Sequence, residues 1–109
     1  MSRLLTSQRP FLELFLQARL SQRKVLLQTV SDVQTKAISE IVHNVLKGNV
    51  PVTTEQQRVL RKYRTLLYTV GDKKIALSQK RRVIISGANP IRDLLGIALE
   101  HIPWLANPS

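Results

Sequence analysis

The feature that most constrains the fold is a stretch of apolar residues at helical spacing near the middle of the chain. Its members are Ile38, Ile41, Val42, Val45 and Leu46. They recur at steps of three and four residues, which places them on one face of an α-helix. Ser31 and Gln34 have the spacing of a capping box, the signal that begins many helices. Gly48 and Asn49 follow the stretch and tolerate the positive φ at which helices often end. The sequence therefore predicts a helix over residues 31–47.

Two shorter helical segments are predicted before this helix. Pro10 stands in the first turn of a segment over residues 10–20, a position where helices tolerate proline. Residues 25–27 indicate a second short piece, either separate from the first or continuous with it. The same region is not expected to act as a secretion signal, because Glu13 and Arg19 interrupt its apolar residues and no small-residue cleavage site follows.

A second long helix is predicted over residues 54–70. Thr53 and Thr54 each precede a glutamine by three residues, so either threonine fits a capping box. The apolar stripe of this helix consists of Val59, Leu60, Tyr63, Leu66, Leu67 and Val70. Its opposite face carries Arg58, Arg61, Lys62 and, towards the edge, Arg64. Gly71 is expected to follow as the C′ residue.

The last third of the chain predicts two more helices. Ser78 is expected to cap a helix that runs through the β-branched residues 83–85, where helix is favoured over strand because no partner strand is visible. Asn89 then caps an amphipathic helix over residues 90–102, and Pro103 ends it.

This last helix has two interpretations. Its amphipathic pattern favours a core or dimer helix. Trp104 behind it also fits a helix lying in a membrane interface, but the polar face of residues 90–102 is not rich in Lys or Arg, as such helices usually are. No apolar run approaches the ~20 residues of a membrane span. A membrane partner is therefore not expected.

One domain, residues 1–109, accounts for all of these segments. The chain is 43% hydrophobic and 22% charged, which is typical of a folded domain with one modest core. We expect an all-α, compact bundle of four to six short helices. A central helix between shorter ones also suggests a histone-like homodimer. The absence of cysteine excludes disulfides and thiolate chemistry, and it fits a reducing compartment.

Positive charge is concentrated between residues 55 and 82. The net charge is +10, and this segment holds nine of the 17 Lys and Arg residues but only Glu55 and Asp72 as acids. A solvated helix face normally interleaves acids with bases, so the imbalance indicates a polyanionic partner, with DNA favoured over RNA. The expected nucleic-acid-binding residues are Arg58, Arg61, Lys62, Arg64, Lys73, Lys74, Lys80, Arg81 and Arg82. If the helices that carry them pack as a hairpin, these residues form one patch.

The sequence offers little for catalysis. His43 and His101 are far apart and lack metal-ligand spacing, and His43 beside an apolar stripe is typical of a structural histidine. The acids form no paired-carboxylate pattern, and no phosphate loop is present. We therefore expect no enzyme activity, no cofactor and no metal site. The scarcity of aromatic side chains also argues against a platform for stacking single strands.

Three segments of the chain resemble a known group of proteins. They are AISEIVHNVLKGNVPVT (37–53), QQRVLRKYRTLL (56–67) and DKKIALSQKRRVI (72–84). Their order is similar to that in small basic proteins of Polinton/Maverick-type elements and adintovirus-like DNA viruses of animals. The resemblance covers about half the chain and implies a virion or core component that accompanies packaged DNA. It implies no catalytic residue. The group has a glycine pair and a strongly apolar tail, whereas this chain has SGANP (86–90) and a charged tail, so no tail function is implied.

We thus expect a non-enzymatic protein that binds double-stranded DNA without sequence preference, as a viral or mobile-element nucleoprotein in the virion or host nucleus. One alternative is a capsid-associated structural or adaptor protein whose basic face docks an acidic protein. Another is a helix-turn-helix regulator with the helix over residues 54–70, or its successor, in the major groove. Salt-sensitive binding to any duplex argues against the adaptor, and the regulator needs marked sequence preference.

Overall fold

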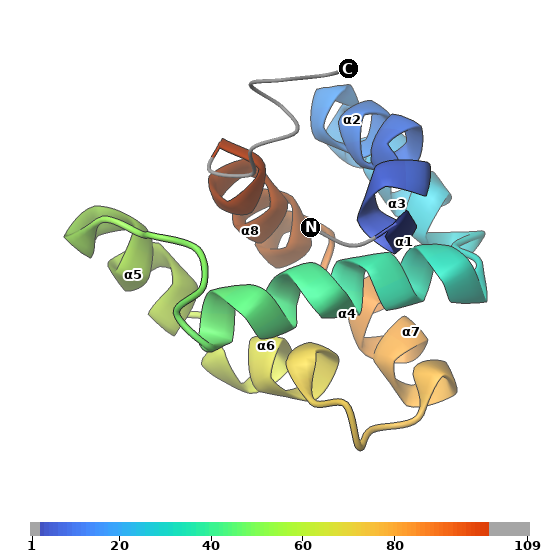
Figure 1. The fold of residues 1–109 in the computed structure, drawn as a ribbon. Helices are drawn as coiled ribbons and strands as arrows, with labels where there is room; N and C mark the ends of the chain where they lie inside the picture. The colour runs from blue at the N-terminus through green and yellow to red at the C-terminus, as the bar shows by residue number, and fades with distance from the viewer. Residues whose placement is uncertain (1–2, 101–109) are drawn as a thin grey trace.

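The fold was obtained as a computed structural model, which describes residues 3–100. The helices are α1 (Arg3–Ser7), α2 (Arg9–Gln17), α3 (Leu20–Gln28), α4 (Asp32–Leu46), α5 (Thr54–Arg61), α6 (Arg64–Gly71), α7 (Leu77–Ser86) and α8 (Ala88–Glu100). The described residues thus form eight helices and no strand (Figure 1). The all-α prediction is confirmed. The expected count of four to six helices is too low, because the predicted segment over residues 54–70 is split into two helices and α1 was not predicted.

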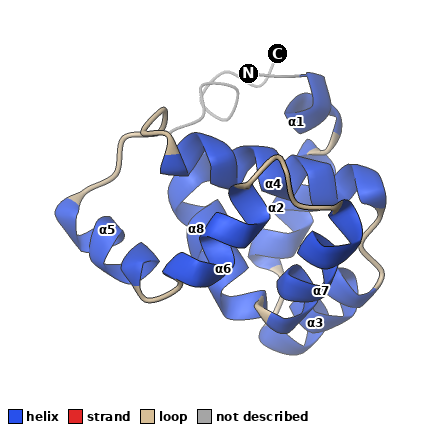
Figure 2. Ribbon diagram, turned by 90° about the horizontal axis from the view of Figure 1, so that it is seen from below, coloured by secondary structure: helices blue, strands red, loops and turns tan. Residues whose placement is uncertain are grey.

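Helix α4 is the centre of the bundle. It is the longest helix, and α1, α6, α7 and α8 all pack against it (Figures 1 and 2). Its start is the predicted capping box: the Ser31 Oγ accepts from the Gln34 backbone N–H at 3.1 Å, and the Gln34 Oε1 accepts from the Ser31 N–H at 2.9 Å. Gly48 follows the helix at φ 78°. The prediction of a helix over residues 31–47 is confirmed within a residue at each end.

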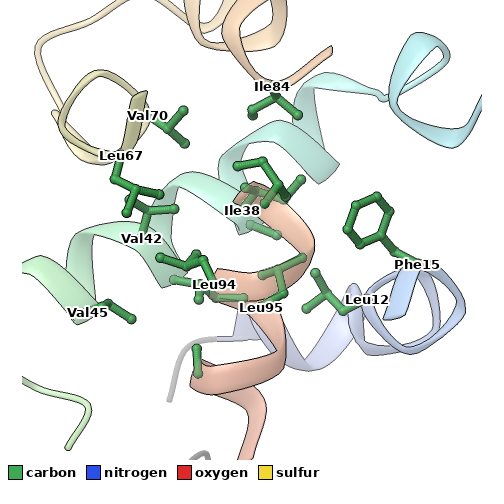
Figure 3. Close-up of a cluster of buried hydrophobic side chains, with 14 of the residues drawn as sticks. Leu12, Phe15, Ile38, Val42, Val45, Leu67, Val70, Ile84, Leu94 and Leu95 are labelled. Carbon is green, nitrogen blue, oxygen red and sulfur yellow. The ribbon is translucent and has the colours of Figure 1, made fainter. Parts of the chain in front are cut away.

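The apolar core lies between α4 and the helices on either side of it. Leu94 and Leu95 of α8 are fully buried and lie between α4 and the side chains of Leu12 and Phe15 from α2 (Figure 3). On the other side of α4, Leu67 and Val70 of α6 and Ile84 of α7 close the core. Because α8 contributes its apolar stripe here, the structure assigns this helix to the core rather than to a free amphipathic surface.

The first predicted segment, residues 10–20, ends earlier than expected. Helix α2 stops at Gln17, and Ala18 is extended at ψ 151°. The Arg23 guanidinium donates from Nη1 to the Ala18 carbonyl at 2.6 Å, so a side chain from α3 satisfies a carbonyl that a continuous helix would have used. The Gln22 Oε1 accepts from the Arg19 N–H at 3.1 Å and starts α3. The first predicted segment therefore corresponds to α2 alone, and the predicted piece at residues 25–27 belongs to a separate helix, α3, after a sharp turn.

The predicted continuous helix over residues 54–70 is also wrong. Thr53 begins it as one of the two candidate caps, with its Oγ1 accepting from the Gln56 N–H at 3.1 Å. The helix then breaks at Lys62 and Tyr63, whose N–H groups bond to carbonyls three residues back instead of four. Helix α5 packs on α8, whereas α6 packs on α4. One straight helix cannot cover both surfaces. The break lets α6 bury Leu67 and Val70 against α4, while Val59 and Leu60 of α5 are partly buried.

Gly71 has a different role from the predicted one. It is the last residue of α6, not a C′ residue of positive φ, and it is buried against α4. A Cβ atom on Gly71 would lie 3.0 Å from the Val42 Cγ1 and 3.3 Å from the His43 backbone nitrogen. Glycine is therefore needed here for the close approach of two helices.

The two helices predicted in the last third of the chain are confirmed, but their bounds differ from the predicted ones. Residues 83–85 are helical, as expected. Helix α7 begins at Leu77 after the N-cap Ala76, so Ser78 lies inside the first turn and is not the cap. Gly87 alone separates α7 from α8, which places Asn89 within the helix. The predicted end at Pro103 lies outside the described residues.

Changing Gly71 to alanine tests the close packing of α6 on α4. We expect Gly71→Ala to lower the free energy of unfolding by about 1–3 kcal/mol, because the buried Val42 side chain and the α4 backbone cannot move away from the added methyl group. Urea denaturation measures this change. Gly96→Ala is the matched control in α8, where the nearest atom is a Leu16 methyl at 3.9 Å, and it should raise stability by up to about 1 kcal/mol through helix propensity. Equal effects of the two substitutions would contradict the packing role.

Candidate nucleic-acid interface

Three cations gather where α5 meets α6. Arg61, Lys62 and Arg64 line a surface hollow of about 390 Å³ together with Thr65 and Leu66. All three cations are exposed. Arg61 and Arg64 are three residues apart, a spacing that places side chains close together even on a continuous helix. The turn at Lys62 and Tyr63 adds Lys62 to the same hollow. We call Arg58, Arg61, Lys62 and Arg64 the corner group.

The hollow also contains the start of α6. Its N-cap residue, Tyr63, makes no side-chain capping hydrogen bond, and the first turn carries no acid. The first N–H groups of a helix have no partner within the helix and carry the positive end of its dipole. Thr65, in this first turn, lines the hollow. The corner therefore joins fixed backbone donors to mobile cationic side chains, a combination that suits an oxyanion.

Arg58 extends the corner group along α5. Its Nη1 lies 3.2 Å from the Glu55 Oε1, and both side chains are mostly exposed. An exposed ion pair of this kind is weak, because water screens it and both side chains lose freedom on forming it. A phosphate that approaches Arg58 competes only with this weak partner.

The remaining exposed cations lie in the loop after α6 and on α7. Lys73 and Lys74 occupy a turn in which the Lys74 N–H donates to the Asp72 Oδ1 at 2.9 Å. Both lysines are exposed, and so is Arg82 on α7. We call Lys73, Lys74 and Arg82 the loop group.

Lys80 and Arg81 make contacts inside the protein instead. Lys80 is 4% exposed, and its Nζ donates to the Ser39 Oγ at 2.7 Å. Arg81 is half-buried and forms an ion pair with Asp32 in the first turn of α4. These two residues fix α7 to α4, so the structure places seven of the nine predicted binding residues, and not these two, on the open surface.

The seven exposed residues do not form one continuous patch. Helix α5 lies at one end of the molecule and α7 at the other, with α6 between them, in both views (Figures 1 and 2). One continuous patch would have required the helix over residues 54–70 and its successor to pack as a hairpin, but only the second half, α6, packs on α7. The corner group and the loop group are thus separate surfaces.

Sequence reasoning missed two features. Tyr68 of α6 is 58% exposed and borders the corner group, although its neighbours belong to the apolar stripe. Lys36, His43 and Lys47 share one face of α4 above a cleft. Their spacing of seven and four residues is that of one helical face. Nothing in the sequence indicated that α7 brings Lys80 to the same cleft.

Comparison of the chain with protein-family models, curated proteins and solved structures finds no match. Among the helices that the structure describes, none is long and apolar enough to cross a membrane. Within residues 3–100, no group of three or more His, Cys, Asp or Glu side chains is placed to hold a metal ion. The geometry of the cations is therefore the basis for a functional proposal.

The burial of Lys80 predicts a pH-dependent contribution to stability. Burial lowers the pKa of Lys80 from its ordinary 10.5, and the nearby charge of Asp72 opposes this shift. The unfolded chain then binds more protons than the folded chain at pH values just below 10.5, so stability from this group rises as the pH rises through that window. We expect the free energy of unfolding of the wild type, relative to Lys80→Met, to increase from pH 7 to 10.5 in urea denaturation.

The control for this measurement is Lys24→Met, which removes a charge from an exposed position on α3. A difference between the wild type and Lys80→Met that stays constant over the whole pH range would contradict the assignment of a buried, desolvated ammonium group.

Proposed function

We propose that the protein binds double-stranded DNA through its phosphate backbone, without sequence preference and without enzymatic activity. The observation that carries this proposal is the corner group, four exposed cations within the seven residues 58–64, three of which line one hollow with the start of α6. Several cations that meet neighbouring phosphates release condensed counterions, and this release drives affinity for any duplex.

The chemistry of the corner favours phosphate over other groups. The arginine side chains of Arg58, Arg61 and Arg64 carry planar forks that bind two phosphate oxygens at once. Among the described residues, the acid that pairs with this group is Glu55, which is exposed and weakly bound to Arg58. Contacts of this type position a duplex but do not distinguish bases. Sequence-neutral binding is therefore the simplest function of this surface.

The geometry gives less support to a helix-turn-helix regulator. Helices α5 and α6 have eight residues each, so each is only about 12 Å long. This alternative placed the helix over residues 54–70 or its successor in the major groove. The first is not continuous in the described residues, and two basic residues of the second, Lys80 and Arg81 of α7, contact α4 instead of solvent. Marked sequence preference in binding would favour the regulator despite this geometry.

The biological role that we propose is that of a nucleoprotein or core component of a virus or mobile element, in the virion or the host nucleus. The resemblance of residues 37–53, 56–67 and 72–84 to proteins of Polinton-type elements supports it. A histone-like homodimer is a subsidiary hypothesis, suggested by the long central helix α4. Sedimentation as a monomer at high protein concentration would contradict it.

A second candidate function is the docking of an acidic protein, for instance inside a capsid. A groove of about 330 Å³ between the end of α4 and the α5–α6 pair favours it. Val50, Leu60 and Leu67 form apolar parts of this groove, and Arg61 and Arg64 border it. Such a lining suits a peptide that combines apolar with acidic residues.

A salt series with unrelated duplexes tests the DNA proposal. We expect log Kd to rise linearly with log salt in the wild type. Changing Arg58, Arg61, Lys62 and Arg64 to Gln should lower the slope of log Kd against log salt by about 3–4, because each lost phosphate contact removes about 0.9 from that slope. Fluorescence anisotropy with two duplexes of different sequence measures both the slope and any sequence preference.

The matched control compares two pairs of substitutions with the same loss of charge. Arg61→Gln with Lys62→Gln alters the corner, whereas Arg19→Gln with Lys24→Gln alters exposed positions at and near the start of α3. The corner pair should weaken binding more than the α3 pair. Negligible DNA binding by the wild type near physiological salt would contradict the DNA proposal and favour an acidic protein partner.

A further inference from the structure

A second cation-rich surface lies along α4, away from the exposed corner. It is a cleft of about 790 Å³ between one face of α4 and the segment formed by the α6–α7 loop and the start of α7. Helix α7 packs against α4, and the loop leads into it from α6 (Figure 1). We call it the α4 cleft. Lys36 and Lys47 line it from α4, 11 residues and so about 16 Å apart, while Lys73 and Lys80 line it from the facing segment.

The lining of the α4 cleft is strongly positive. Four lysines contribute to it, and Glu40 is the single carboxylate among its lining residues. Lys36, Lys47 and Lys73 are exposed and keep their freedom to move. Field lines concentrate in a concave surface lined by one sign of charge, so this cleft attracts anions more strongly than the same lysines would on a flat surface.

Lys80 differs from the other three lysines because it is buried. Its Nζ donates to the Ser39 Oγ at 2.7 Å, and the Ser39 hydroxyl in turn donates to the Val70 carbonyl at 2.7 Å. An ammonium group has three N–H donors, and Ser39 accepts one of them. Among the described residues, no ion pair includes Lys80. The nearby charge of Asp72 stabilises the ammonium only in part, because burial still lowers the pKa of Lys80. An anion in the adjoining cleft would relieve the remaining cost of burying this charge.

The start of α7 adds to the attraction. Its N-cap residue, Ala76, makes no side-chain capping hydrogen bond, and Leu77 in the first turn lines the α4 cleft. The positive end of the α7 dipole therefore acts in the same region as Lys80. Backbone donors, one buried ammonium and three mobile ammonium groups converge on one cavity.

We propose that the α4 cleft binds a free oligophosphate, either inorganic or as the phosphate chain of a nucleotide. Lys80 faces the cleft from a buried position that the backbone of a duplex does not reach, whereas a chain of two or three phosphates does. The lysines spaced along the cleft then contact its successive groups as point charges. This site does not depend on DNA binding by the corner group, so each proposal stands or fails separately.

Titration with tripolyphosphate tests the proposal. With the isotope-labelled full chain at constant ionic strength, we expect saturable shifts of backbone amide NMR signals within residues 36–47 and 73–80. Isothermal titration calorimetry then gives the Kd. Changing the exposed Lys36 and Lys47 to Gln should weaken binding about tenfold or more, because two of the four lysines are lost without disturbing the core. Lys80→Met, at the buried position, should weaken it as well.

The control variant Arg61→Gln with Lys62→Gln removes the same charge from the corner and should change the Kd less than about twofold. Equal losses in the two double variants would overturn the proposal, because binding would then follow net charge alone. Shifts centred on the corner, or no saturable binding, would also overturn it. A DNA duplex that displaces tripolyphosphate from the cleft amides would overturn the assignment to a free oligophosphate, since the cleft would then be part of the DNA surface.

Discussion

The hydroxyl group of Ser39 joins three helices of this protein at one point. It donates to the Val70 carbonyl at the end of α6 and accepts from the Lys80 ammonium of α7, while Ser39 itself belongs to α4. One residue further along α6, Gly71 touches the α4 backbone, and the His43 Nδ1–H donates to its carbonyl at 3.1 Å. Polar groups that are buried at a helix end need such partners. The path of the chain from α6 into α7, which carries the loop group and one side of the α4 cleft, depends on this contact.

The sequence predicted the structure best where the signal was local. The capping residues Ser31 and Thr53 begin their helices through the hydrogen bonds that their spacing implied, and Gly48 has the positive φ expected of it. Capping signals succeed because donor and acceptor lie within four residues, so no distant part of the chain decides the outcome. The helical assignment of residues 83–85 holds for a related reason, since no strand in the described residues competes for them.

The breaks between helices were not predictable from the same signals. The apolar stripe over residues 54–70 is continuous in sequence, yet its halves pack on different helices. Nothing local distinguishes Lys62 and Tyr63 as a turn, because neither residue is Gly or Pro and both tolerate helix. Gly71 was identified as important, but its reason is the distance to Val42 rather than its φ. Tertiary packing overrides propensity at each of these positions.

The basic residues show the same limit for the candidate site. Composition identified the segment over residues 55–82, and the corner group within it is exposed as expected. Burial, however, depends on which helix a side chain meets. Lys80 and Arg81 are neighbours of the exposed Arg82, but Lys80 meets Ser39 and Arg81 meets Asp32. Some basic side chains of this segment, Lys80 and Arg81, therefore hold α7 in place, and the others are open to solvent.

Helix α5 contains no buried side chain, although it carries half of the corner group. An isolated helix of eight residues is only marginally stable in water. Detaching α5 from α8 exposes little additional apolar surface, because none of its side chains is buried. We therefore expect α5 to unfold locally more often than α4. Its backbone amide hydrogens should then exchange with solvent faster than those of α4. Under the proposed function, Arg58 and Arg61 lie on a helix that can shift to follow the curvature of a bent duplex without disturbing the core.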